Sequence, residues 1–138
     1  MTEPREIKER TFDFATRIVR LCRALEEMSG APRTLANQLL RSGTSIGANV
    51  EEAHGSHSKP DFIAKMSIAT KEARETNYWL RLIAATEMVP PSELAEITDE
   101  STVESAGCAV EACSPRLKPR SPRSQPQAPR LPPSLPRL

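Results

Sequence analysis

The 138 residues of the chain suffice for one domain, and a content of 4% aromatic and 38% apolar residues favours a small helical core over a sheet. No apolar run approaches the roughly 18 residues of a membrane span, and the charged N-terminus is unlike a signal peptide, which excludes a membrane protein and places the chain in the cytoplasm. The net charge of +1 combines an acidic body, with 13 Lys or Arg and 18 Asp or Glu in residues 1–114, with a basic tail that carries six Lys or Arg.

The first predicted helix covers residues 11–28, where apolar residues recur at helical spacing until a Gly and Pro stop signal. The second covers residues 33–54. It contains the stretch RSGTSIGANVEEA, residues 41–53, in which two glycines, a threonine, two serines and an asparagine stand where better helix formers are expected. These small residues predict that a neighbouring helix packs closely against this segment and compensates for their poor propensity.

The third predicted helix, residues 59–88, has the clearest pattern, with Ser58 as its N-cap and one continuous apolar face. A fourth is predicted over residues 92–112. Its apolar pattern changes phase after Ile97 and is interrupted by Gly107, so this helix is expected to be divergent or incomplete.

The composition changes at residue 114. Eight of the 13 prolines lie in residues 115–138, which favours an extended, disordered tail that cannot bury a core. The tail also holds RLPPSLP, a match to ligands of aromatic grooves, although any proline-rich segment produces such matches. The chain is therefore predicted to be all-α, with a helical domain in residues 1–113 and a Pro- and Arg-rich tail in residues 114–138.

A polar stripe lies beside the apolar face of the second helix. Its members are Gln38, Arg41, Ser45, Asn49 and Glu52. We favour a packing and register role, in which Ser45 and Asn49 hydrogen-bond across a helix pair. The alternative is a polar site with Arg41 and Glu52 as charged members. No nucleophile and base accompany them, so no enzyme activity is predicted.

The third helix carries a second apolar ridge away from its main face. The predicted interface residues on this side are Ile68, Glu72, Glu75, Trp79 and Leu82. A helix that is apolar on two sides needs two partners, and a Trp among charges is typical of interfaces, so we predict self-association. The alternative is that Trp79 only covers the core of a monomer.

Basic side chains form two strips that could contact phosphate. The third helix offers Lys71, Arg74 and Arg81 around Tyr78, and the first helix offers Arg17, Arg20 and Arg23. Nearby glutamates weaken the positive electrostatic field of these strips, so a single subunit is expected to bind nucleic acid poorly. A ring of subunits would place several such strips together.

The sequence predicts no metal and no cofactor. His54 and His57 lack the HExxH spacing, and the three cysteines include no CxxC pair. An S-x-x-K match at Ser56 lacks its companion motifs. No small-molecule substrate is indicated.

Residues 12–97 resemble the small bacterial four-helix bundle proteins of the 23S rRNA intervening-sequence family. The matching positions are Arg41, Ser42, Ser45, Ile46, Asn49, Val50, Glu52 and Ala53, then Phe62, Lys71, Glu72, Glu75, Trp79 and Leu80. The resemblance implies an antiparallel four-helix bundle that assembles as a ring, typically a pentamer, without catalytic activity. A relative, the accessory protein of diversity-generating retroelements, uses such a ring to bind nucleic acid and a reverse transcriptase. The family's fourth helix carries a Leu/Ile pattern that this chain lacks.

The sequence therefore predicts a non-enzymatic protein that assembles with copies of itself as a structural or accessory subunit. The alternative is an accessory protein that binds RNA or DNA through the basic strips of an oligomeric ring.

Overall fold

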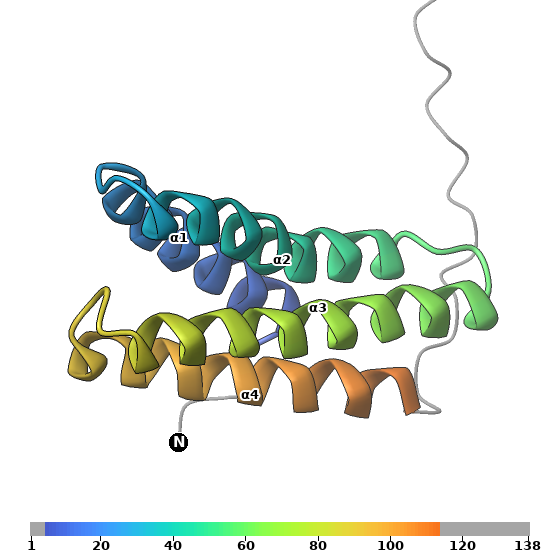
Figure 1. The fold of residues 1–138 in the computed structure, drawn as a ribbon. Coiled ribbons are helices and arrows are strands. Elements are labelled where there is room, and N and C mark those ends of the chain that lie inside the picture. The colour runs from blue at the N-terminus through green and yellow to red at the C-terminus, as the bar shows by residue number, and fades with distance from the viewer. Residues whose placement is uncertain (1–4, 114–138) are drawn as a thin grey trace, which may run out of the picture.

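The computed structural model describes the backbone of residues 5–113 and the side chains of residues 5–102, 107 and 108. Four helices make up this part of the chain: α1 (Ile7–Glu26), α2 (Ala31–His54), α3 (Lys59–Ala85) and α4 (Pro91–Cys113). Short loops make each helix run antiparallel to the next, so that α2 packs on α1 and α3, and α3 packs on α4 (Figure 1). The prediction of an all-α four-helix bundle is confirmed. The tail, residues 114–138, lies outside the described residues, so its disorder and the predicted domain division stay predictions.

The helix ends differ from the predicted ones by a few residues. α1 begins at Ile7 rather than at residue 11, because Ile7 is itself buried in the core. α3 ends at Ala85 rather than at residue 88. Glu87 has a φ of 55°, and the Met88 N–H bonds back to the Ile83 carbonyl, an arrangement that closes the last turn of a helix.

The core lies along the axis of the bundle and receives side chains from all four helices. The largest fully buried apolar side chains are Phe14, Ile18 and Leu25 of α1, Leu39, Ile46 and Val50 of α2, Met66, Leu80 and Ile83 of α3, and Leu94 of α4. Burial of each such side chain contributes about 1.5–3 kcal/mol relative to exposure, which makes this core the main source of stability.

α2 uses its small residues differently on its two sides. Toward α1, a Cβ atom added to Gly43 would lie only 2.7 Å from Ile18 Cγ2, and one added to Gly47 would lie 3.3 Å from the Thr11 carbonyl oxygen. Toward α3, the buried Ser42 and Thr76 side chains hydrogen-bond to each other. The prediction that a helix packs closely on this segment is confirmed. α1 lies against Gly43 and Gly47, and α3 lies against Ser42.

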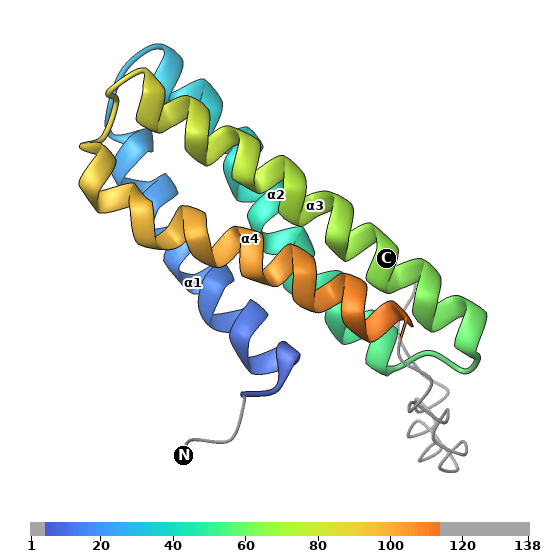
Figure 2. The ribbon, with the colours of Figure 1, turned by 90° about the horizontal axis from the view of Figure 1, so that it is seen from below.

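The fourth helix is continuous from Pro91 to Cys113, within a residue of the predicted range. Its described buried face continues the phase of Leu94 and Ile97 through Ser101 and Cys108. α4 lies against α3 along its length and meets α1 less extensively (Figure 2). None of the helices in the described part of the chain is both long and apolar enough to cross a membrane.

Candidate interaction surface

The two predicted residue sets on α2 and α3 come together on one face of the bundle. We call this face the α2–α3 surface; it comprises Arg41, Ser45, Asn49 and Glu52 of α2 with Lys65, Ile68, Glu72, Glu75 and Trp79 of α3. Leu82 is half-buried one turn beyond Trp79. Ser42 and Thr76 lie beneath this surface and hold the two helices together.

Arg41 makes the polar contacts at the Trp79 end of the α2–α3 surface. Its guanidinium forms an ion pair with the Glu75 carboxylate and a longer contact of 3.5 Å with Glu72. The Trp79 indole donates a hydrogen bond of 3.2 Å to the same Glu75 carboxylate, which orients the ring. The hydrogen bond from Arg41 lowers the pKa of Glu75, burial opposes this shift, and the bond from Trp79 adds to it. Glu75 is thereby held in its charged form between two donors.

A second ion pair crosses the same helices near the end of α2. Lys65 Nζ lies 2.8 Å from the Glu52 carboxylate, and the hydrogen bond from that contact raises the pKa of Lys65. The charges of the α2–α3 surface are therefore paired within the subunit. Ile68 remains 40% exposed among them.

Ser45 and Asn49 do not hydrogen-bond across the helix pair, so that prediction was wrong. The Ser45 hydroxyl donates to the Arg41 carbonyl at 2.6 Å, and the Asn49 amide donates to the Ser45 carbonyl at 2.8 Å, both within α2. A carbonyl four residues earlier is the nearest acceptor for short polar side chains on a helix. The bond that crosses the pair is that of Ser42 and Thr76. Both residues lie on the apolar faces of their helices, and this position in the sequence could have identified them as the bonded pair.

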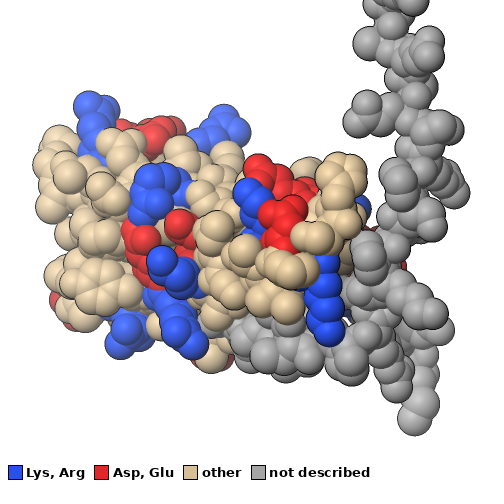
Figure 3. Space-filling model, turned by 90° about the vertical axis from the view of Figure 1, so that its right-hand side faces the viewer, with Lys and Arg blue, Asp and Glu red and all other residues tan. Residues whose placement is uncertain are grey.

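The basic residues predicted to contact phosphate do not form one continuous basic patch. Arg17 of α1 pairs with Glu100 of α4 and lies 3.7 Å from Glu96. On α3, Arg81 donates to the Asn77 amide oxygen, whereas Lys71 and Arg74 are exposed. The face shown in Figure 3 likewise carries basic and acidic side chains next to one another.

Arg20 is exposed and lines a shallow hollow between α1 and α4. The hollow has a volume of about 310 Å³ and is lined by Arg17, Arg20, Leu21, Val89, Glu93, Leu94 and Ile97. Its lining combines two arginines and one glutamate with four apolar side chains and includes no nucleophile.

The Cys22 thiol and the possible metal ligands of the described residues form no reactive site. Burial raises the pKa of the Cys22 thiol to about 12, and that thiol donates to the Ala36 carbonyl inside the core. Such a thiol is not activated as a nucleophile. In the described part of the chain, no three His, Cys, Asp or Glu side chains are grouped so that they could hold a metal ion.

The sequence model of the 23S rRNA-intervening sequence proteins matches residues 3–106, three quarters of the chain. The chain belongs to the 23S rRNA-intervening sequence protein family. The chain is also similar to a crystal structure described as that of a protein with unknown function from the S23 ribosomal protein family, from Bacteroides thetaiotaomicron VPI-5482. It shares 38% sequence identity and a TM-score of 0.73, over 79% of this chain and 100% of that one.

No curated protein sequence matches the chain significantly. The predicted family resemblance is confirmed, whereas the relation to the retroelement accessory protein stays a prediction. Seven of the nine residues of the α2–α3 surface, all except Lys65 and Ile68, are positions on which the predicted resemblance is based.

Proposed function

We propose that this family member is a non-enzymatic cytoplasmic subunit that assembles with copies of itself through the α2–α3 surface. The observation that carries the proposal is the ordered group of Arg41, Glu75 and Trp79, together with the exposed Ile68 about three turns from Trp79 on the same side of α3. The family resemblance suggests five subunits. In this role the chain acts as a structural scaffold or as an accessory subunit of a larger complex.

The energetics of the α2–α3 surface support association. Its charges already have partners within the subunit, so covering them would not leave an unpaired charge away from water. Trp and Arg at the centre of a contact typically contribute most to the free energy of binding. Because Glu75 fixes the indole, Trp79 loses little side-chain entropy on association.

The same contacts argue against the enzyme alternative. Arg41 is occupied by Glu72 and Glu75, and Glu52 is occupied by Lys65. Both side chains are thus engaged in ion pairs rather than with a nucleophile, which an acyl or phosphoryl transfer site would require. A non-enzymatic role therefore fits the arrangement best.

The test compares two matched isoleucines of α3. Ile68 is 40% exposed on the α2–α3 surface, and Ile63 is 37% exposed about 140° around the same helix. Ile68→Lys is expected to reduce the mass measured by light scattering to that of a monomer, because it places a charge in the contact. Ile63→Lys is expected to keep the mass of the unsubstituted chain. Equal masses for the two variants would contradict the proposal.

A second candidate function is nucleic-acid binding by the assembled subunits, of the kind predicted for a reverse-transcriptase partner. The exposed Lys71, Arg74 and Tyr78 on α3 favour it. The test is RNA and DNA binding by a chain truncated after Cys113, so that the basic tail cannot contribute. The logarithm of the binding constant falls linearly with the logarithm of the salt concentration. Changing Lys71 and Arg74 to Gln should make this slope less steep by about 0.9 for each duplex phosphate that is no longer neutralised. Binding that is absent without the tail would reject this candidate.

A further inference from the structure

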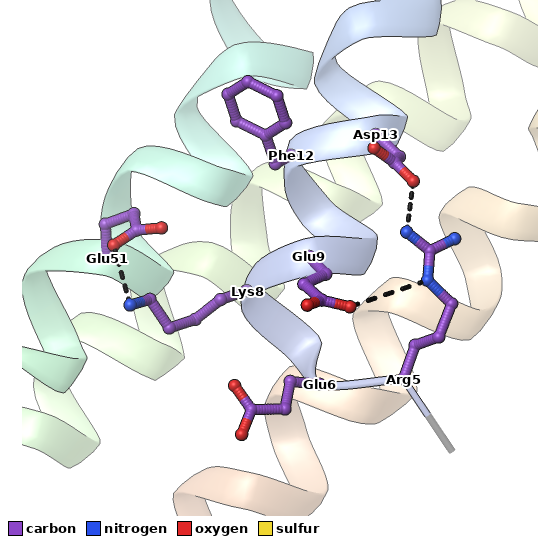
Figure 4. A pocket seen from close by; sticks show the side chains of 7 residues that line it. All are labelled: Arg5, Glu6, Lys8, Glu9, Phe12, Asp13 and Glu51. Carbon is purple, nitrogen blue, oxygen red and sulfur yellow. Dashed lines mark hydrogen bonds and ion pairs between the residues drawn. The ribbon is translucent and has the colours of Figure 1, made fainter. Parts of the chain in front are cut away.

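Phe12 of α1 is 69% exposed, the largest exposed fraction among the large apolar side chains of the described residues. It borders a hollow of about 470 Å³ near the start of α1, and Figure 4 shows its ring extending from the helix beside the Lys8 and Glu51 pair. All other described residues that line this hollow are charged. An aromatic side chain within a polar rim is typical of a surface that another segment covers.

The charges around Phe12 have a negative excess. The hollow is lined by two cations, Arg5 and Lys8, and by four carboxylates, those of Glu6, Glu9, Asp13 and Glu51. Both cations already pair with carboxylates of this group. The Glu6 carboxylate has no ion-pair partner within the described part of the chain. The hollow therefore suits a segment that brings apolar side chains together with further positive charge.

The C-terminal tail of the same chain has this chemistry. Residues 115–138 carry six Lys or Arg, no Asp or Glu, and eight prolines. Within them, residues 130–137 (RLPPSLPR) place two leucines and three prolines between two arginines. Segments of this composition favour the polyproline II form, dock on aromatic side chains and pair their arginines with carboxylates. The family match ends at residue 106, so the tail lies outside it.

The tail starts close enough to Phe12 to reach it. A Cβ atom added to Gly107 of α4 would lie 3.1 Å from Ile7 Cδ1, so this part of α4 lies against the first turn of α1, at the end of the bundle where α4 ends (Figure 2). From Cys113 to Phe12 the path is about 17 Å along the bundle, plus about 140° around α1. Residues 114–129 span up to about 50 Å in polyproline II form, which exceeds this path.

We propose that residues 130–137 dock on the hollow around Phe12 of the same chain, with leucine and proline side chains against the ring and the arginines on the surrounding carboxylates. The tether favours this segment over free competitors, because it holds the segment at a millimolar effective concentration. The docked tail connects the end of α4 to α1, two helices that otherwise meet less extensively than the other neighbouring pairs. This contact is separate from the α2–α3 surface and does not require self-association.

The experiment measures how fast trypsin first cuts the full chain after Arg130, with the fragments identified by mass spectrometry. Docking covers this bond, and Phe12→Ala removes the ring on which the segment docks. The variant is expected to be cut there about tenfold faster, since a segment tethered at about 1 mM is mostly bound even with a Kd of about 0.1 mM. The bond after Arg120, in the connecting part of the tail, should be cut equally fast in both proteins.

Met28→Ala is the matched control, because Met28 is a 40% exposed apolar side chain beyond the other end of α1. It should leave cleavage after Arg130 at the rate of the unsubstituted chain. Glu6→Gln and added salt should each accelerate this cleavage, because both weaken the charge contacts. Circular dichroism should show the same helicity in all variants.

Equal rates after Arg130 in the unsubstituted and Phe12→Ala chains would overturn the inference. An equal acceleration by Met28→Ala would also overturn it, because the effect would then not depend on the hollow. Protection that is lost on dilution would show that the segment binds a second copy, which overturns docking within one chain. None of these results bears on the proposed self-association, which the mass of the chain tests separately.

Discussion

The hydroxyl groups of Ser42 and Thr76 meet 3.0 Å apart in the buried contact between α2 and α3. The Thr76 hydroxyl also lies 2.8 Å from the Glu72 carbonyl of its own helix, and that of Ser42 lies 3.4 Å from the Leu39 carbonyl. A polar pair in an apolar row costs stability if either partner is removed, and it fixes how the two helices align. The alignment matters because Arg41 and Glu75 meet on the surface directly above it.

Removal of either hydroxyl tests this pair. Ser42→Ala and Thr76→Val are each expected to lower the free energy of unfolding by about 1 kcal/mol, because each breaks the same hydrogen bond. The double variant should then cost less than the sum of the single ones. Urea unfolding of the four proteins measures these values, and strictly additive costs would show that the two hydroxyls do not interact.

Gly43→Ala tests the close approach of α1 to α2. Ala is about 0.8–1 kcal/mol better than Gly in a helix, yet the new Cβ would lie 2.7 Å from Ile18 Cγ2. The crowding is expected to outweigh the propensity and to destabilise the protein by about 1–3 kcal/mol. In an Ile18→Ala background the same change should become neutral or stabilising. Thermal unfolding measures the stability of each variant. A Gly43→Ala protein that is more stable than the unsubstituted one would contradict the packing described.

The glycine and hydroxyl residues of α2 made its packing predictable, because poor helix formers in an otherwise regular helix require a compensating neighbour. The residue that each would meet was not predictable. A helical wheel gives the side of the helix on which Arg41 lies, but not the height at which α3 passes it. The ion pair with Glu75 and the choice of Ser42 over Ser45 as the crossing hydroxyl depend on that height.

The fourth helix was underestimated for a related reason. Counting large apolar residues missed that Ser101 and Cys108 are small enough to face the core directly. It also missed Asn77 of α3, whose amide donates to Ser101 Oγ at 2.9 Å, to Thr102 Oγ1 at 3.1 Å and to the Thr98 carbonyl at 3.3 Å. Polar anchoring of this kind leaves no periodic signal in hydropathy.

Asn77→Ala should therefore loosen α4 selectively. The change removes the amide that donates to the Ser101 and Thr102 hydroxyl groups, whereas the Thr98 carbonyl keeps the Ser101 hydroxyl as a donor at 2.7 Å. The change is expected to cost about 1–3 kcal/mol. Hydrogen exchange should accelerate in residues 98–102 more than in α1 and α2. Arg81→Gln is the matched control, since Arg81 is exposed and donates to the Asn77 oxygen rather than to α4, and it should change stability by less than about 0.5 kcal/mol. Uniform acceleration in all helices would contradict a specific anchor.

The Arg41 and Glu75 pair predicts a pH dependence. Because the pKa of Glu75 is lowered in the folded chain, the stabilisation by the pair is present above the ordinary value of 4.5 and is lost as the pH falls through the lowered pKa. Arg41→Gln should raise the Glu75 titration midpoint, followed by NMR at its carboxyl carbon, toward 4.5. The stability difference between the two proteins should be present at neutral pH and vanish in acid. A difference that is independent of pH would rule out the ion pair as its source.

Self-association is the central claim, and the mass of the unsubstituted full chain in solution tests it most directly. A subunit has a mass of 15.2 kDa. Sedimentation equilibrium over a range of protein concentrations should give a mass several times this value, falling toward it only on dilution. A mass of 15.2 kDa at every concentration would contradict the account.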